Sequence, residues 1–427
     1  MGLIVRQAQR AGAEAERVDI AIEDGVITAV GSGLEHTAEV EIDAGGRLVT
    51  APFVDSHFHL DAVLTAGTPR RNVSGTLLEG IALWGELQPL LTHEGVKERA
   101  REYLRWCVSQ GILFLRSHVD ICQESLVAVR ALVELRDELR GVIDVQLVAF
   151  PQHGLLRFPG AVRLLDEALD LGLDIVGGIP HYERSREAGV HSIRLLMERA
   201  ERRGLPVDMH CDETDDPLSR FVEVLAEETV ARDMQGRVTG SHLTSLHSVD
   251  SAYFAKLLAL LGDAELMVIS NPLLNMITQA RADTYPKRRG LTRVRELMAA
   301  GINVSFGHDC TLDPWYPLGA ADMLEVASMG LHACQMSGEH EIGLMFDAVT
   351  SHGARTLRLA GYGLEPGCAG DLVVLDAFSV ADALRTRPAR LAVVRAGEVV
   401  ARTAAPERAV LGAGLSGPVD FVQPAFQ

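Results

Sequence analysis

The sequence lacks the features that mark membrane and secreted proteins. No apolar run approaches the ~18–20 residues that span a bilayer, and residues 1–11 contain no apolar segment of a signal peptide. The cysteines are scattered without any C-x-x-C pair, which is typical of reduced thiols rather than of a disulfide scaffold. They are Cys107, Cys122, Cys211, Cys310, Cys334 and Cys368. These absences predict a cytoplasmic globular protein without a membrane partner.

Positive charge is also scarce. The 427 residues carry 40 basic against 58 acidic side chains, a formal net charge of -18. Such a charge argues against nucleic acid or an anionic membrane as partner, because both are polyanions. It does not exclude a small neutral molecule such as a free base. With 47% hydrophobic residues, the chain is long enough for one large core and a smaller module.

Short β-like runs punctuated by glycine occupy both ends of the chain. The ranges are 18–22, 26–30 and 38–42 near the start, and 371–375, 391–395 and 397–400 near the end. Between these ends, strands alternate with amphipathic helices such as 96–108, 124–138, 161–171 and 191–203. The chain therefore has two β-rich ends and a long α/β middle.

Eight strands can be placed in the middle part. They are expected to end near His57, His118, Phe150, Pro180, His210, His242, Asn271 and Asp309. Eight β-then-α units over roughly 300 residues predict a (β/α)8 barrel of the TIM type. A doubly wound open sheet is the alternative. Polar residues at the C-terminal ends of many different strands favour the barrel, because a barrel places its active site at that face.

The strand ends carry candidate metal ligands. Strand one ends in His57-Phe-His59, and alternate residues of a strand point to the same side, so both imidazoles can face one metal ion. Strands five, six and eight end in His210, His242 and Asp309. Imidazoles and one carboxylate suit Zn²⁺ or Fe²⁺ and leave a position open for water. The pattern predicts a metal-dependent hydrolase.

Residue by residue, this pattern resembles the amidohydrolase superfamily. Within it, several segments are similar to the bacterial cytosine deaminases, and the resemblance runs through nearly the whole chain. The segments are 74–77 (SGTL), 150–152 (FPQ), 178–181 (GIPH), 210–213 (HCDE), 283–290 (DTYPKRRG) and 313–317 (DPWYP). The resemblance implies a small β-sandwich domain formed by both chain termini, residues 1–50 plus 365–427. The catalytic barrel would comprise residues 51–364.

The resemblance also implies a role for each site residue. One divalent metal ion, zinc or iron, would be held by His57, His59, His210 and Asp309. With Asp309, His242 would take the proton of the metal-activated water, and Glu213 would protonate the ring nitrogen beside the leaving amine. Gln152 would hydrogen-bond the carbonyl edge of the base, with the backbone near Leu77. The substrate would be a free aminopyrimidine base, cytosine or 5-methylcytosine, and the protein a homo-oligomer.

The absence of lysine from the middle strands limits the class of reaction that the chain is expected to catalyse. Superfamily members that cleave ring amides commonly bridge two metal ions with a carboxylated lysine on strand four. Here no lysine occurs between Lys97 and Lys256, so the middle strands lack that bridge. A single metal ion, typical of deaminases, is the expectation.

Cys310 departs from the pattern of the cytosine deaminases, which carry a second aspartate after the metal aspartate. That position lies near C5 of the pyrimidine. A thiol is small and polarizable, so a 5-methyl group could pack on it. We therefore expect 5-methylcytosine to be accepted. The alternatives are that Cys310 has no effect on substrate choice, or that its thiolate binds the metal.

Three further residues are candidates for contact with the substrate. Phe150 and His181 are candidates for the pocket wall, and Trp315 either stacks on the base or forms an apolar rim. Two rival functions stay open. One is deamination of another aminated heterocycle, such as isoguanine, creatinine or a triazine. The other is a catalytically inactive scaffold, against which the complete set of candidate ligands argues.

Overall fold

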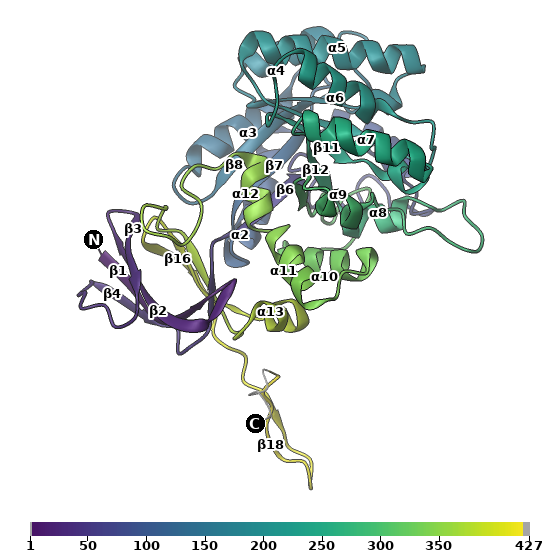
Figure 1. Ribbon diagram of the computed structural model, residues 1–427. Coiled ribbons are helices and arrows are strands. Elements are labelled where there is room, and N and C mark those ends of the chain that lie inside the picture. Colours follow the sequence, from purple (N-terminus) through teal and green to yellow (C-terminus); the bar gives the residue numbers. More distant parts are fainter. Residues whose placement is uncertain (1, 422–427) are drawn as a thin grey trace.

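The computed structural model describes residues 2–421, which contain two main sheets (Figure 1). The first has eight parallel strands in the order β13-β12-β11-β10-β9-β8-β7-β6. Their bounds are β6 Phe53–Phe58, β7 Ile112–Asp120, β8 Asp144–Phe150, β9 Ile175–Gly178, β10 Val207–Cys211, β11 Val238–His242, β12 Met267–Ser270 and β13 Val304–Phe306. The predicted eight-stranded (β/α)8 arrangement is confirmed, and the open doubly wound sheet is not formed.

One short seam closes the barrel. The backbone N–H of Asp309 donates to the carbonyl of His57 at 2.8 Å, and Phe58 and Asp309 form an isolated parallel bridge. The carboxylate of Asp55 reinforces the seam by accepting from the backbone N–H of His308 at 3.0 Å. The first and last strands of the barrel therefore meet at the point where the predicted ligands lie.

Helices surround this sheet. Their bounds are α1 Leu77–Leu87, α2 His93–Ser109, α3 Val127–Glu138, α4 Ala161–Asp170, α5 Arg186–Arg203, α6 Phe221–Ala231, α7 Ser251–Asp263, α8 Pro272–Thr278, α9 Val294–Ala299, α10 Met323–Cys334, α11 Glu339–Asp347, α12 Ser351–Leu357 and α13 Val380–Thr386. Capping defines several ends. The Ser185 side chain accepts from the N–H of Ala188 at the start of α5, and Gly204, with a φ of 66°, ends that helix in the left-handed conformation.

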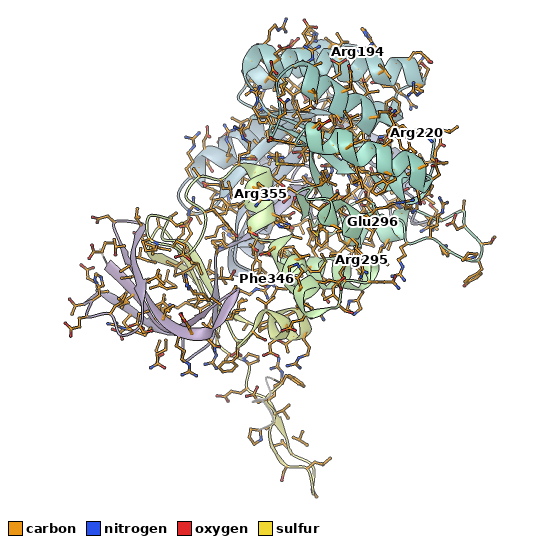
Figure 2. All side chains as sticks on the ribbon, viewed as in Figure 1. Arg194, Arg220, Arg295, Glu296, Phe346 and Arg355 are labelled. Carbon is orange, nitrogen blue, oxygen red and sulfur yellow. The ribbon has the colours of Figure 1, made fainter. Side chains whose placement is uncertain are left out.

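The outer helices are tied together by arginines at the surface (Figure 2). Arg194 of α5 donates to Glu228 of α6 at 2.8 Å, and the Arg220 guanidinium lies 3.9 Å from the ring centre of Tyr253 on α7. Exposed pairs of this kind contribute little to stability individually. The strength of the barrel lies in its core, where every residue of β6 and β7 is buried.

The second sheet joins the two ends of the chain. Its order is β16-β15-β14-β5-β1-β2-β3, and β4 pairs with β1. The bounds are β1 Gly2–Arg10, β2 Ala13–Glu23, β3 Val26–Gly31, β4 Val40–Asp43, β5 Leu48–Thr50, β14 Leu372–Leu375, β15 Arg390–Arg395 and β16 Glu398–Arg402. A separate apolar cluster, including Ile20 and Leu372, belongs to this sheet. The β-rich ends predicted from the sequence thus lie side by side.

A small hairpin follows this sheet. Strands β17 (Ala409–Val410) and β18 (Gly417–Pro418) pair with each other and extend away from the rest of the molecule (Figure 1). Throughout the described range, no helix combines the length and the apolar character needed to cross a membrane.

Candidate active site

The C-terminal ends of the barrel strands bring the predicted ligands together. His57 lies in β6, His59 follows it, and His210 and His242 lie at the ends of β10 and β11. Asp309 follows β13. All five side chains are buried, with at most 6% of their surface exposed. Because these strands run parallel in one closed barrel, residues far apart in the sequence share one end of it.

The ligand atoms lie at distances that suit a shared metal ion. His59 Nε2 lies 3.2 Å from His210 Nε2, and His57 Nε2 and His59 Nε2 each lie 3.5 Å from Asp309 Oδ1. Neighbouring ligands at the ~2.0–2.1 Å typical of zinc stand about 2.8–3.4 Å apart. His57 belongs to two groups of mutually close ligand atoms, one with His59 and Asp309 and one with His210 and His242. His57 Nε2 is buried and makes no hydrogen bond. These side chains therefore fit a divalent cation.

The protonation states suit a cation as well. Burial lowers the pKa of His59 to about 3. Burial, reinforced by repulsion among neighbouring imidazoles, lowers the pKa of His57 and His210 well below the usual value. Neutral imidazoles offer the lone pairs that a metal needs. Burial raises the pKa of Asp309, and the nearby Glu213 and Asp313 raise it further. A cation bound beside these carboxylates would offset this effect and favour their charged forms.

Beside the cluster lie a histidine and a carboxylic acid. His242 Nδ1 is 3.6 Å from Glu213 Oε1 and 3.8 Å from Asp309 Oδ2, and the amide of Asn275 lies 3.0 Å from the same nitrogen. Burial raises the pKa of Glu213 to about 8. Its Oε1 has no hydrogen-bond partner. A carboxyl group that holds its proton near neutral pH is suited to proton transfer.

The backbone is bent at these positions. His242 and Asp309 have φ angles of 73° and 70°, in the left-handed region that residues other than glycine rarely adopt. Such conformations persist where the surrounding structure imposes them, and they cluster at functional sites. Here they turn the chain sharply where β11 ends and just beyond β13, so that Asp309 lies in the cluster and His242 beside it.

A small pocket adjoins the cluster. It is lined by His59, Leu77, Gln152, His210, Glu213, His242, Leu274, Asp309, Cys310 and Trp315. An outer cavity of about 690 Å³ shares Leu77, Gln152 and Glu213 with it and so forms its vestibule. Four residues predicted to contact substrate, Leu77, Gln152, Cys310 and Trp315, therefore line the inner pocket.

The other two predicted contact residues lie elsewhere. The Phe150 ring stacks on His210, with centroids 4.0 Å apart and planes 16° from parallel, so it supports a candidate ligand from behind. His181 lines the vestibule, where burial lowers its pKa to about 4. Leu274, in α8, lines the inner pocket and was not predicted. An apolar helix residue carries no sequence signal for such a role.

Asp120 organises the roof of the pocket. Its carboxylate accepts hydrogen bonds from the Trp84 indole at 2.7 Å and the Gln88 amide at 2.8 Å, and from the backbone N–H of Gln152 at 3.3 Å. The Trp84 ring lies 6.0 Å from that of Trp315. These contacts join residues far apart in the sequence, so no local pattern indicates the role of Asp120.

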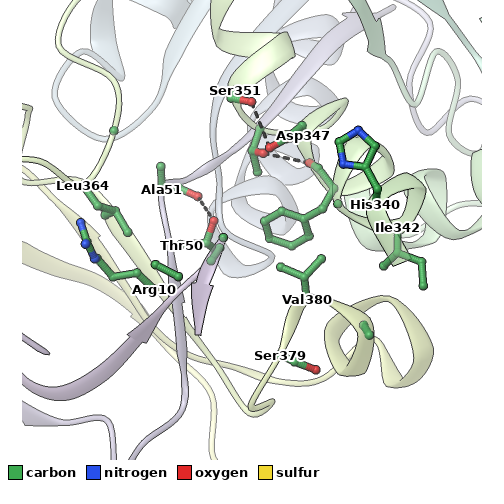
Figure 3. A pocket seen from close by; sticks show the side chains of 18 of the residues that line it. Arg10, Thr50, Ala51, His340, Ile342, Asp347, Ser351, Leu364, Ser379 and Val380 are labelled. Atoms are coloured by element: carbon green, nitrogen blue, oxygen red, sulfur yellow. Dashed lines mark hydrogen bonds between the residues drawn. The ribbon is translucent and has the colours of Figure 1, made fainter. Parts of the chain in front are cut away.

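A second, larger cavity lies apart from this pocket (Figure 3). It measures about 750 Å³, lies between β5 and the helices α11 and α13, and shares no residue with the inner pocket. Its polar groups are satisfied locally: the Thr50 hydroxyl donates to the carbonyl of Ala51, and that of Ser351 to Asp347. It therefore lacks the convergent, unsatisfied polar groups of the cluster.

Comparisons with known proteins agree with this geometry. Residues 40–402 match the family described as "Amidohydrolase family". The crystal structure of 5-methylcytosine deaminase from Klebsiella pneumoniae, liganded with 5-fluorocytosine, superposes with a TM-score of 0.90 and is 42% identical, covering 95% of this chain and 98% of that one. N-isopropylammelide isopropyl amidohydrolase of Pseudomonas sp. (strain ADP) is 29% identical over 90% of this chain and 93% of its own length. Pterin deaminase of Rhizobium rhizogenes is 26% identical, with coverages of 91% and 88%.

Proposed function

The chain belongs to the amidohydrolase family and is a hydrolase acting on C–N bonds, and from this we propose that it deaminates a free aminopyrimidine base, 5-methylcytosine or cytosine, to thymine or uracil and ammonia. The observation that carries the proposal is the inner pocket. In it, His59, His210 and Asp309 lie beside an acid, Glu213, and an amide, Gln152, that can bind the edge of a planar base. The 42% identical deaminase supports the choice of substrate.

We assign the metal ligands as His57, His59, His210 and Asp309, holding one zinc or iron ion. Such an ion supplies an activated water at neutral pH. His242, 3.8 Å from Asp309 Oδ2, takes up the proton that this water loses. Glu213 donates its proton to the ring nitrogen next to the amine, which makes the ring a better acceptor for the nucleophile. His242 returns its proton to the amine, which leaves as ammonia, and Glu213 regains a proton from the new hydroxyl group as the carbonyl forms.

The remaining pocket residues hold the base. The Gln152 amide hydrogen-bonds the carbonyl edge. As the first residue of α1, Leu77 has an N–H group without an acceptor inside the helix, and this group is free to bind the substrate. Trp315 and Leu274 cover the ring faces, because a planar base gains most from apolar and aromatic contacts. Cys310 lies at the C5 position.

The direct test is a substrate panel. Protein loaded with Zn²⁺ or with Fe²⁺ is assayed for ammonia release from cytosine, 5-methylcytosine, isoguanine and creatinine, and for amine release from N-isopropylammelide. We expect 5-methylcytosine or cytosine to have the highest kcat/KM. Turnover of another compound with neither pyrimidine reacting would reject the assigned substrate while keeping the hydrolase.

Removal of the metal should abolish activity and lower stability. A cation bound only by the folded state stabilises it by about 2.7 kcal/mol when present at 100 times its Kd. We expect one metal ion per chain, loss of activity after chelation, and a Tm lower by several degrees. Zn²⁺ or Fe²⁺ should restore both properties. Mg²⁺ should not, because it prefers oxygen ligands. Full activity of the metal-free protein would contradict the assignment.

Gly80 sets the position of Trp315. A Cβ atom at Gly80 would lie 2.3 Å from Trp315 Cδ1, so the indole would have to move. We expect Gly80→Ala to raise KM about tenfold, in keeping with the ~1–3 kcal/mol cost of overpacking. Gly85→Ala in the same helix is the matched control, because no atom lies within 4 Å of its added Cβ. Steady-state kinetics of both variants are compared, and equal KM values would show that Trp315 does not shape the pocket.

A further inference from the structure

A chain of buried polar side chains runs beneath the cluster, on the side away from the pocket. His57 Nδ1 lies 3.1 Å from Ser241 Oγ, and this hydroxyl donates to Asp208 Oδ1 at 2.6 Å. The other oxygen of Asp208 accepts from Arg116 Nη1 at 2.8 Å. Ser241 and Asp208 have no exposed surface, and Arg116 has 2%. The chain therefore connects a candidate metal ligand to an ion pair in the barrel interior.

The hydrogen bonds of the chain favour one placement of the protons. When Ser241 gives its single proton to Asp208, its oxygen accepts at the His57 side. His57 Nδ1 therefore carries the hydrogen in this hydrogen bond, and Nε2 keeps its lone pair. Nε2 is the nitrogen that faces Asp309 Oδ1 at 3.5 Å and makes no hydrogen bond. The tautomer that the chain selects is thus the one that leaves Nε2 free to bind a cation.

The far end of the chain is fixed. Arg116 Nε and Nη2 donate to Gln146 Oε1 at 3.0 and 2.9 Å, and Nη2 also donates to the carbonyl of Thr356 at 2.9 Å. The guanidinium is therefore held from three directions and fixes Asp208 in turn. The chain spans four barrel strands: His57 is in β6, Arg116 in β7, Asp208 in β10 and Ser241 in β11.

We propose that Ser241 and Asp208 are positioning residues that hold His57 in the tautomer and orientation in which its Nε2 binds the metal ion. The inference rests on the metal ligands assigned above and is independent of which base is the substrate. Partners behind a ligating histidine fix its ring and increase its basicity, and their loss typically costs 10- to 100-fold in metal affinity.

The test measures Zn²⁺ affinity by competition with a chromophoric chelator, without any substrate. We expect Ser241→Ala to bind Zn²⁺ about 10- to 100-fold more weakly than the unchanged protein. Ser270→Ala is the matched control. Ser270 lies on the neighbouring strand β12, is fully buried, and its hydroxyl makes no hydrogen bond. Its loss should leave the affinity unchanged. Equal affinities of Ser241→Ala and the unchanged protein, or equal weakening in both variants, would overturn the proposal.

A second measurement reads the tautomer in the unchanged protein, and a variant serves only to assign the signal. Protein labelled with [¹⁵N]histidine reports the tautomer of His57 through its two ring nitrogens, and His57 is identified by the signal that His57→Asn lacks. Hydrogen on Nδ1 in the metal-free protein supports the proposed role of Ser241 and Asp208, and hydrogen on Nε2 refutes it. If the unchanged protein fails to bind Zn²⁺, the assigned metal site is wrong. The tautomer of His57 still shows whether Ser241 and Asp208 fix the proton on Nδ1.

Discussion

Replacing Glu213 by glutamine should lower kcat by about 10²- to 10⁴-fold, the usual contribution of a general acid or base, while the bound metal is retained. The substitution preserves the shape of the side chain and removes only the proton that it transfers. Glu213 lies in the pocket next to His242, with its pKa raised by burial to about 8. The proton is therefore held at neutral pH, where the reaction needs it. Kinetics and metal content are measured on the same preparation.

Glu183→Gln is the control for this experiment. Glu183 lines the vestibule and accepts a hydrogen bond from the backbone N–H of Leu156 at 2.9 Å, away from the cluster. Its replacement should change kcat by no more than a few-fold. A Glu213→Gln enzyme that keeps more than a tenth of its activity would exclude Glu213 as the proton donor. Loss of metal in that variant would assign it a ligand role instead.

Replacing Cys310 by aspartate should reverse or abolish a preference for 5-methylcytosine. Cys310 lines the inner pocket with 2% of its surface exposed, and its Sγ lies 3.7 Å from Asp309 Oδ1. Burial raises the pKa of its thiol, and Asp313 and Asp309 raise it further. In the proposed binding mode, the side chain that faces C5 is thus neutral and polarizable. A carboxylate there would have to lose hydration beside a methyl group.

The size of this effect follows from two terms. A buried methyl group contributes about 0.8 kcal/mol, and leaving a buried polar group unsatisfied costs about 1–3 kcal/mol. Together, about 1.8–3.8 kcal/mol corresponds to a roughly 20- to 600-fold fall in the ratio of kcat/KM for 5-methylcytosine to that for cytosine. The ratio is the quantity to compare, because repulsion between the new carboxylate and Asp309 slows both reactions.

Cys310→Ala completes the comparison. It removes the sulfur without adding charge, so the preference for 5-methylcytosine should persist. The same ratio in all three proteins would mean that Cys310 does not select the substrate.

The strand ends could be predicted from the sequence because the signal is local. A short β-branched run followed by a histidine or an aspartate identifies both the strand and its functional end, as with His57, His210 and Asp309. Helix limits were less accurate. The predicted helix 191–203 begins at Arg186 in the structure, where Ser185 caps it. Strand β1, the centre of the second sheet, was not predicted, although Leu3, Ile4 and Val5 are fully buried there.

The supporting residues could not be predicted, because their roles depend on contacts across the barrel. Asp208 and Ser241 look like ordinary strand residues, and only the pairing of β10 with β11 places them together. Asp120 likewise acquires its role from Trp84 and Gln88, which approach it from another part of the chain. Sequence patterns identify residues that perform chemistry more readily than residues that hold them in place.

The seam between β6 and β13 determines when the candidate ligands come together during folding. The first barrel strand supplies His57 and His59, and the segment after the last supplies Asp309, so the cluster does not exist until nearly the whole barrel has been synthesised and closed. A nascent or truncated chain that lacks β13 has no complete set of ligands. With the ligands proposed above, only a finished barrel would bind the cation, and the bound cation would join the two ends of the barrel sheet, between which the backbone makes few contacts.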